Sequence, residues 1–99
     1  MLPYHGADPA FSISGKTAII TGGAAGIGHA TAKFFFDKGA QVILADCNPE
    51  TDAIAHELSP DRALGIRADI LKGDDRQRIF DAACERFGQV DILVNCAGI

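Results

Sequence analysis

The chain has 99 residues, a formal net charge of -4 at pH 7 and an apolar fraction of 47%. This length allows one small domain, and the mixed charges exclude an extended basic surface for nucleic acid. The three cysteines have neither zinc-ligand nor disulfide-framework spacing, and no apolar run is long enough to cross a membrane. We therefore expect a cytoplasmic protein of small-molecule chemistry, with no metal, nucleic-acid or membrane partner.

The first ten residues contain two prolines and a glycine and show no helical or strand periodicity. We predict that residues 1–10 form a mobile arm and that one domain spans residues 11–99.

A glycine-rich segment, Thr21–Gly28, follows the apolar run Thr17–Ile20 and precedes a helical pattern. Strand, glycine turn and helix in this order present free amides and a positive helix end to a dinucleotide diphosphate. We expect Gly22 to turn the chain, Gly26 to let the cofactor approach the backbone, and Gly28 to let helix and sheet pack closely.

The helical pattern after this turn ends at Gly39. Its apolar spacing of i, i+3, i+4, i+7 and i+8 predicts one face turned to the core, made of Ile27, Ala30, Thr31, Phe34 and Phe35. Phe36 lies opposite Ile27 on the helical wheel, so we expect it to point toward solvent unless the arm or another subunit covers it.

A nearly continuous apolar run, Gln41–Ala45, predicts a strand buried on both faces, and Asp46 follows it. Asp46 stands 18 residues beyond Gly28, close to the spacing at which an acid binds the adenosine ribose in dinucleotide folds. The alternative is that Asp46 only begins the next loop. We favour the ribose contact because Asp46 coincides with the glycine turn.

Asp46 also predicts the choice of cofactor. A 2′-phosphate ~4 Å from a carboxylate is repelled by about 4 kcal/mol per unit charge at an effective dielectric near 20. A third of that, roughly 1.4 kcal/mol, is a tenfold preference for NAD over NADP. No Lys or Arg stands at Ala24, Ala25, Cys47 or Asn48 to reverse it.

Asn48-Pro49-Glu50 predicts the start of a short helix with Ile54, Ala55 and Leu58 inside. A third strand, Ala63–Ala68, is followed by Asp69 and Ile70. Asp69 either accepts a hydrogen bond from the adenine amino group, with Ile70 against the base, or caps the following turn.

From Asp74 the pattern is again helical, with an apolar stripe made of Ile79, Phe80, Ala83, Cys84 and Phe87. A fourth strand, Val90–Val94, follows. Alternation of strands and helices predicts an α/β fold: a partial, Rossmann-like, doubly wound parallel sheet of order 3-2-1-4 with three crossover helices. The first two helices should cover one face and the third the other, with an open fourth-strand edge that invites association.

Together these segments resemble the short-chain dehydrogenase/reductase family. Thr21–Gly28 matches its TGxxxGIG turn, Asp46 its NAD-selecting acid, Asp69-Ile70 its adenine contact and Asn95–Gly98 its NNAG segment. The resemblance implies cofactor contacts from Gly22, Gly26, Ile27, Gly28, Asp46, Asp69, Ile70, Asn95, Ala97 and Gly98.

The sequence departs from the family pattern at two positions. Cys96 replaces an Asn, which is tolerable if Ala97 and Gly98 present their backbone to the nicotinamide ribose. Leu71 replaces the Ser or Thr that would cap the third helix, so we expect a helix start near Gly73 unless Asp69 or Asp74 caps it.

The family's catalytic Ser and Tyr-x-x-x-Lys are missing from these residues, since the single tyrosine, Tyr4, is followed four positions later by Asp8. The resemblance implies hydride transfer between NAD and an alcohol or ketone, and a homo-oligomer in the full-length form. We expect this chain to be the truncated NAD-binding portion, without catalytic residues and inactive alone. The alternative is a complete, non-enzymatic nucleotide-binding or interaction module.

Overall fold

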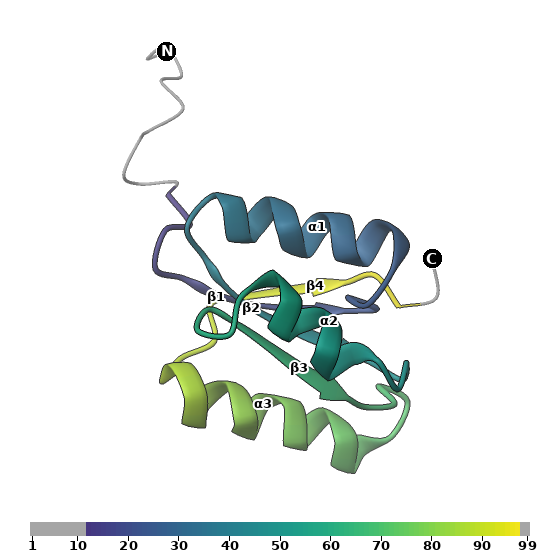
Figure 1. Cartoon of the computed structure of the whole chain (residues 1–99). Helices are drawn as coiled ribbons and strands as arrows, with labels where there is room; N and C mark the ends of the chain where they lie inside the picture. The colour runs from purple at the N-terminus through teal and green to yellow at the C-terminus, as the bar shows by residue number, and fades with distance from the viewer. Residues whose placement is uncertain (1–11, 98–99) are drawn as a thin grey trace, which may run out of the picture.

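The computed structural model describes residues 12–97, so the predicted arm, residues 1–10, and Gly98 lie outside the described residues. Residues 12–97 form a parallel sheet and three helices (Figure 1). The elements are β1 (Thr17–Thr21), α1 (Gly26–Asp37), β2 (Gln41–Asp46), α2 (Thr51–Leu58), β3 (Ala63–Arg67), α3 (Gly73–Phe87) and β4 (Ile92–Asn95).

The sheet has the predicted order, β3-β2-β1-β4, and all its neighbouring strands are parallel. The central strands β1 and β2 are buried along nearly their whole length, which explains their continuous apolar runs. Parallel pairing brings the carboxyl ends of the strands to one edge of the sheet. That edge carries the glycine turn after β1, Asp46 at the end of β2, and Asp69 shortly after β3.

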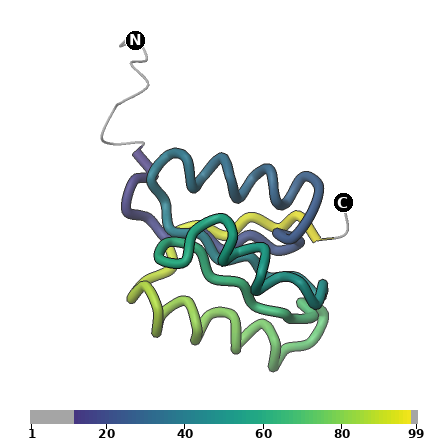
Figure 2. The backbone as a smooth tube through the Cα atoms, viewed as in Figure 1, coloured from purple at the N-terminus to yellow at the C-terminus, as the bar shows by residue number. Residues whose placement is uncertain are grey.

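The helices divide over the two faces as predicted: α1 and α2 lie on one side of the sheet and α3 on the other (Figures 1 and 2). Two buried clusters result. One contains Ala32 of α1 and Ala55 of α2, and the other contains Ile79 and Ala83 of α3. No helix in the segment 12–97 is long and apolar enough to cross a membrane.

The predicted buried face of α1 is wrong. Ile27 is 61% exposed and Phe34 is 58% exposed, whereas Gly28 and Ala32 are buried. Phe35 is half-buried, as expected for the predicted face. Ala30, also on the predicted face, is exposed. The spacing argument favours large apolar residues, whereas the closest approach of the helix is made by the small residues Gly28 and Ala32.

Phe36 does not point toward solvent as predicted; it is half-buried and packs against the first core cluster. The Arg62 guanidinium stacks 4.0 Å from the Phe36 ring centroid. The same side chain donates hydrogen bonds through Nη2 to the carbonyl oxygens of Phe36 and Ala40, at 2.6 and 3.0 Å. Arg62 therefore covers the aromatic ring that the helical wheel placed outside.

The second helix begins later than predicted. Asn48 Oδ1 accepts the N–H of Glu50 at 2.8 Å, which closes a turn before the helix, and α2 starts at Thr51. The predicted inner residues are confirmed: Ala55 is buried, and Ile54 and Leu58 pack against the core.

The third helix begins at Gly73, where it was expected. Ile79 and Ala83 are buried and Phe87 packs against them, but Cys84 and Phe80 are exposed, contrary to the prediction. Among residues 12–97, α3 is alone on its face, so only a narrow stripe of it reaches the sheet.

Gly28 sets the distance between α1 and the turn before it. A Cβ atom at this position would overlap the carbonyl oxygen of Gly22, which is backbone and cannot move aside. The predicted close-packing role of Gly28 agrees with this contact.

Replacing Gly28 with Ala should therefore lower the free energy of unfolding by about 2 kcal/mol or more, through overpacking. Chemical denaturation of the two proteins measures this difference in the free energy of unfolding. Gly73→Ala is the matched control because the added methyl group meets only Arg76 Nη2, at 3.5 Å; it should be neutral or slightly stabilising. Equal stability of the two variants would contradict the close contact.

The corrected orientation of α1 makes a second prediction. Phe36→Ala should cost about 2 kcal/mol of unfolding free energy, because a half-buried ring and its contact with Arg62 are lost. Phe34→Ala, in the same helix, should cost less than about 1 kcal/mol because that ring is largely solvated. The opposite ranking in denaturant titrations would restore the face predicted from the sequence.

Candidate functional site

A cavity of about 550 Å³ lies at the carboxyl edge of the sheet, where β1, β2, β3 and β4 end. Most of the predicted cofactor residues meet there. Its lining includes Gly22, Gly26, Ile27, Gly28, Asp46, Asp69, Ile70 and Ala97. The structure therefore collects in one place residues that are as many as 75 positions apart in the sequence.

The N-terminus of α1 opens onto this cavity. Its N-cap, Ala25, has no side-chain oxygen to accept a hydrogen bond from the first-turn amides, and this turn contains no acidic residue. The amides of Gly26, Ile27 and Gly28 are thus left to bind something else, and the helix dipole adds partial positive charge there. Both features suit an anion such as a phosphate.

Two glycines leave room for a ligand at this helix end. Gly22 has a φ of +69°, and a Cβ there would come within 2.9 Å of the Ala97 nitrogen, so only glycine fits between the turn and the residues that follow β4. A Cβ at Gly26 would have no neighbour within 4 Å, so it would project into free space beside the cavity. A group the size of a diphosphate could use that space.

Asp46 is half-buried at the end of β2, and both its carboxylate oxygens are anchored. Oδ2 accepts the N–H of Ala24 at 3.0 Å, and Oδ1 accepts the N–H of Asn48 at 3.0 Å. A carboxylate oxygen can accept more than one hydrogen bond. Asp46 can therefore hold the glycine turn in place and still accept hydrogen bonds from two vicinal hydroxyl groups.

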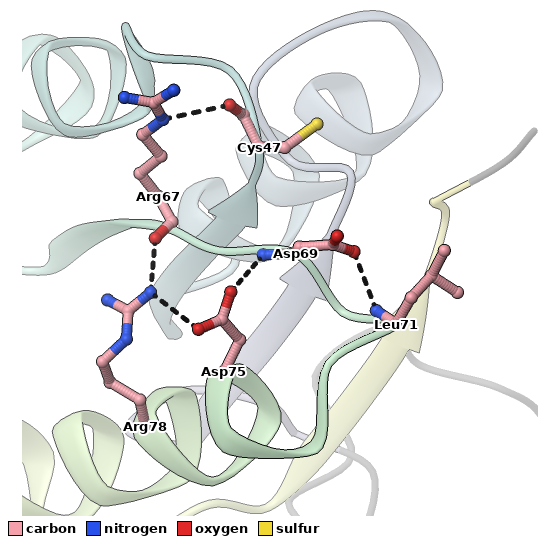
Figure 3. Close-up of polar contacts among 6 residues, drawn as sticks. All are labelled: Cys47, Arg67, Asp69, Leu71, Asp75 and Arg78. Atoms are coloured by element: carbon pink, nitrogen blue, oxygen red, sulfur yellow. Dashed lines mark hydrogen bonds and ion pairs between the residues drawn. The ribbon is translucent and has the colours of Figure 1, made fainter.

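The β3–α3 connection forms another wall, from Asp69 to Leu71. Asp69 Oδ1 accepts the N–H of Leu71 at 3.0 Å, so Asp69 does stabilise the turn, which was the alternative role considered for it (Figure 3). Its other oxygen, Oδ2, makes no hydrogen bond within residues 12–97 and can accept one from a ligand. Leu71 is 85% exposed, an unusual state for an apolar side chain in a wall of a cavity.

Asp69 and Asp74 were the alternative caps considered for the third helix, and neither caps it. Lys72 is the N-cap of α3 and makes no side-chain cap hydrogen bond. Instead Asp75 Oδ2 accepts the backbone N–H of Asp69 at 2.8 Å (Figure 3). This N–H donor, helped by the Arg78 guanidinium, lowers the pKa of the Asp75 carboxyl below its ordinary value.

Two predicted residues are not in the cavity lining as described. Asn95 belongs to β4, where its Oδ1 accepts the Thr21 hydroxyl at 2.7 Å, and it lines a smaller hollow on the α3 side of the sheet. Gly98 lies outside the described residues. The strand begins two residues later and ends one residue later than predicted. Side chains alternate along it, so Asn95 lies on the α3 face of the sheet, opposite Val94 and Cys96, which pack against the first core cluster.

Sequence reasoning did not select several residues that line the cavity: Ala25, Ala45, Cys47, Ala68, Leu71 and Cys96. Each stands next to a selected residue at a strand end or in the glycine turn, so adjacency was the available signal. The lining includes two carboxylates and no Lys or Arg. Within residues 12–97 no group of three metal-ligating side chains is close enough to hold a metal ion.

Comparisons with known proteins agree with this geometry. The family model described as short chain dehydrogenase matches residues 16–99. An NAD-dependent glycerol dehydrogenase of Listeria innocua is 35% identical over 98 residues, which are 99% of this chain and 39% of that protein. Momilactone A synthase of Oryza sativa subsp. japonica is 40% identical over 96% of this chain and 35% of its own length.

A solved structure is similar in both fold and sequence. It is the crystal structure of a 3-ketoacyl-(acyl-carrier-protein) reductase from Brucella melitensis complexed with NADH, with a TM-score of 0.78 and 41% identity, covering 83% of this chain and 34% of that one. The chain thus spans little more than a third of the length of these relatives. With a family match that runs from Lys16 to the last residue, the chain belongs to the short-chain dehydrogenase family.

Proposed function

We propose that this chain is the NAD-binding portion of an oxidoreductase that transfers hydride between NAD and an alcohol or ketone. One observation carries the proposal: the uncapped N-terminus of α1 and the Asp46 carboxylate open onto the same cavity. The first suits a diphosphate and the second suits the hydroxyls of a ribose. NAD presents these two groups next to each other.

In this proposal the amides of Gly26, Ile27 and Gly28 hold the diphosphate. Gly22 and Gly26 leave the space that the cofactor backbone needs. The bound nicotinamide supplies the hydride chemistry, whereas these residues bind and orient it. The name of the Listeria relative and the NADH in the Brucella structure support the choice of cofactor.

Asp46 selects NAD over NADP. The half-buried carboxylate accepts hydrogen bonds from a free 2′-hydroxyl but repels a 2′-phosphate. No cation in the cavity lining described above offsets this repulsion. The anchoring of both oxygens by Ala24 and Asn48 also keeps the carboxylate from turning away.

The two ends of NAD then lie on opposite sides of the turn. Asp69 and Ile70 form the wall for adenine, with the unbonded Asp69 oxygen as the acceptor for its amino group. Ala97 lies beside Gly22 and, with Gly98, belongs to the segment proposed for the nicotinamide ribose. Asn95, which is outside the cavity lining, supports this segment by accepting the Thr21 hydroxyl.

We assign no general acid or base for the hydride transfer to the residues of this chain. Tyr4 is the single tyrosine of the 99 residues and has no lysine four positions later, so the family's Tyr-x-x-x-Lys motif is not found in them. We expect the chain alone to bind NAD without turning over a substrate. Cys47 and Cys84 are exposed free thiols, which supports a cytoplasmic location. A homo-oligomer is proposed only for a full-length form.

One observation supports the alternative function, a non-enzymatic binding or interaction module. β4 is an edge strand in the described sheet, and Leu93 on it is 56% exposed. Such an edge can pair with a partner. The coding sequence after the codon for Ile99 distinguishes these two proposed functions. A Ser and a Tyr-x-x-x-Lys motif in frame would support the oxidoreductase, and a genuine stop codon would support the module.

The cofactor choice is tested by titrating NAD and NADP against the purified chain in a calorimeter. NAD should bind at least about tenfold more tightly than NADP, from the repulsion at Asp46. Asp46→Asn should narrow this ratio, since it removes the charge but keeps an oxygen acceptor of the same size.

Asp46→Ala serves as the comparison, because it also removes the acceptor for the Ala24 and Asn48 amides. It should weaken binding of both nucleotides in addition to narrowing their ratio. A ratio that is the same in the original chain and in Asp46→Asn would remove Asp46 from the ribose site.

A further inference from the structure

Polar side chains of the first two turns of α3 reach back to the cavity wall formed by Asp69, Ile70 and Leu71. Asp75 Oδ2 accepts the Asp69 N–H at 2.8 Å, and its Oδ1 lies 3.4 Å from Arg78 Nη2. Figure 3 shows both contacts, which place one carboxylate between the wall and the helix. The wall is thus tied to α3 by more than chain connectivity.

The same contacts continue to a second wall of the cavity. Arg78 Nη2 donates to the Arg67 carbonyl oxygen at 2.7 Å, and Arg67 Nε donates to the Cys47 carbonyl oxygen at 3.3 Å (Figure 3). Cys47 lines the cavity directly after Asp46. A continuous set of hydrogen bonds therefore joins the wall after β3 to the loop after β2.

This arrangement differs from ordinary helix capping. In a capping box the acid at the third helical position bonds the N–H of the N-cap residue. Asp75 occupies that third position in α3, and the N-cap is Lys72, but Asp75 bonds the N–H of Asp69, three residues earlier. Leu71 has no hydroxyl to bond a helix amide. Two side chains of α3 hold this turn instead: Asp75 accepts the Asp69 N–H, and Arg76 Nη1 donates to the Ile70 carbonyl oxygen at 2.6 Å.

We propose that Asp75 and Arg78 are positioning residues for the nucleotide site, fixing the Asp69–Leu71 wall relative to Cys47 and so setting the affinity for the adenosine half of the cofactor. This inference rests on the proposed function. Neither residue lines the cavity, so both act through backbone groups that do.

The network itself is tested without any ligand. In ¹H–¹⁵N spectra recorded as a function of pH, the Asp69 amide should follow the ionisation of Asp75, with a pKa below the ordinary aspartate value. Lys72 and Arg78 are the cations near this carboxylate. Asp75→Asn should abolish this transition of the Asp69 amide; a transition that persists in the variant would overturn the network.

The positioning role is tested by titrating AMP, nicotinamide mononucleotide and NAD. Asp75→Ala should weaken the binding of AMP and of NAD by at least about fivefold. This factor is the lower limit of the coupling that is usual between two sites of a protein. Nicotinamide mononucleotide, which lacks adenosine, should be unaffected. Asp75→Asn, which keeps an oxygen acceptor, should recover part of the loss. A merely structural residue would weaken all three ligands together.

Asp81→Ala is the matched control, because Asp81 is an exposed aspartate of the same helix whose Oδ1 accepts a hydrogen bond from Gln77 and, among residues 12–97, from no other side chain. It should leave all affinities unchanged. If Asp75→Ala fails to fold, Arg78→Met decides, since it cuts the link to Arg67 and leaves the Asp75–Asp69 bond intact; it should also weaken AMP.

The outcomes separate the two proposals. A chain that binds no NAD before any substitution overturns the proposed function. The positioning role alone is overturned if the chain binds NAD but Asp75→Ala and Arg78→Met bind AMP and NAD as tightly as Asp81→Ala does.

Discussion

The rest of the structure depends on how closely α1 approaches the turn that precedes it. A Cβ atom at Gly28 would overlap the Gly22 carbonyl, so the helix can begin this near the sheet only because the residue is glycine. That contact places the N-terminal amides of α1 at the carboxyl edge of β1. It also explains why Gly28 and Ala32 face inward, while Ile27 and Phe34 face outward.

The anion site at the N-terminus of α1 and the ribose acceptor Asp46 lie next to each other because β1 and β2 are paired in a fixed register. Gly22 donates its N–H to the Ala45 carbonyl at 2.7 Å, and Ala24 donates to the Asp46 carboxylate one residue further on. A change in the register of these strands would move the carboxylate relative to the helix end. The chemistry of the cavity thus follows from the sheet, and the loops around it adjust only its outer walls.

The sequence predicted the sheet order, the layers and the convergence of Gly22, Asp46 and Asp69, because strand patterns are local and parallel pairing brings their ends together. The rotation of α1 could not be predicted from residue spacing. The spacing argument places the large apolar residue Ile27 on the buried face, whereas close packing requires the glycine at position 28 to lie there. Asn95 was selected because its neighbours in the sequence match the family segment, but the alternation of side chains along β4 places it on the α3 face of the sheet. The Asp75 contact with Asp69 needs the geometry of the turn, which no local pattern encodes.

The central claim is that the first-turn amides of α1 and the Asp46 carboxylate bind adjacent parts of one nucleotide. A crystal structure of the chain with NAD tests it most directly. The account predicts the diphosphate within hydrogen-bond distance of the Gly26–Gly28 amides, and the adenosine ribose hydroxyls on the Asp46 oxygens. A diphosphate bound away from this helix end, or an Asp46 carboxylate that no ribose hydroxyl reaches, would contradict it.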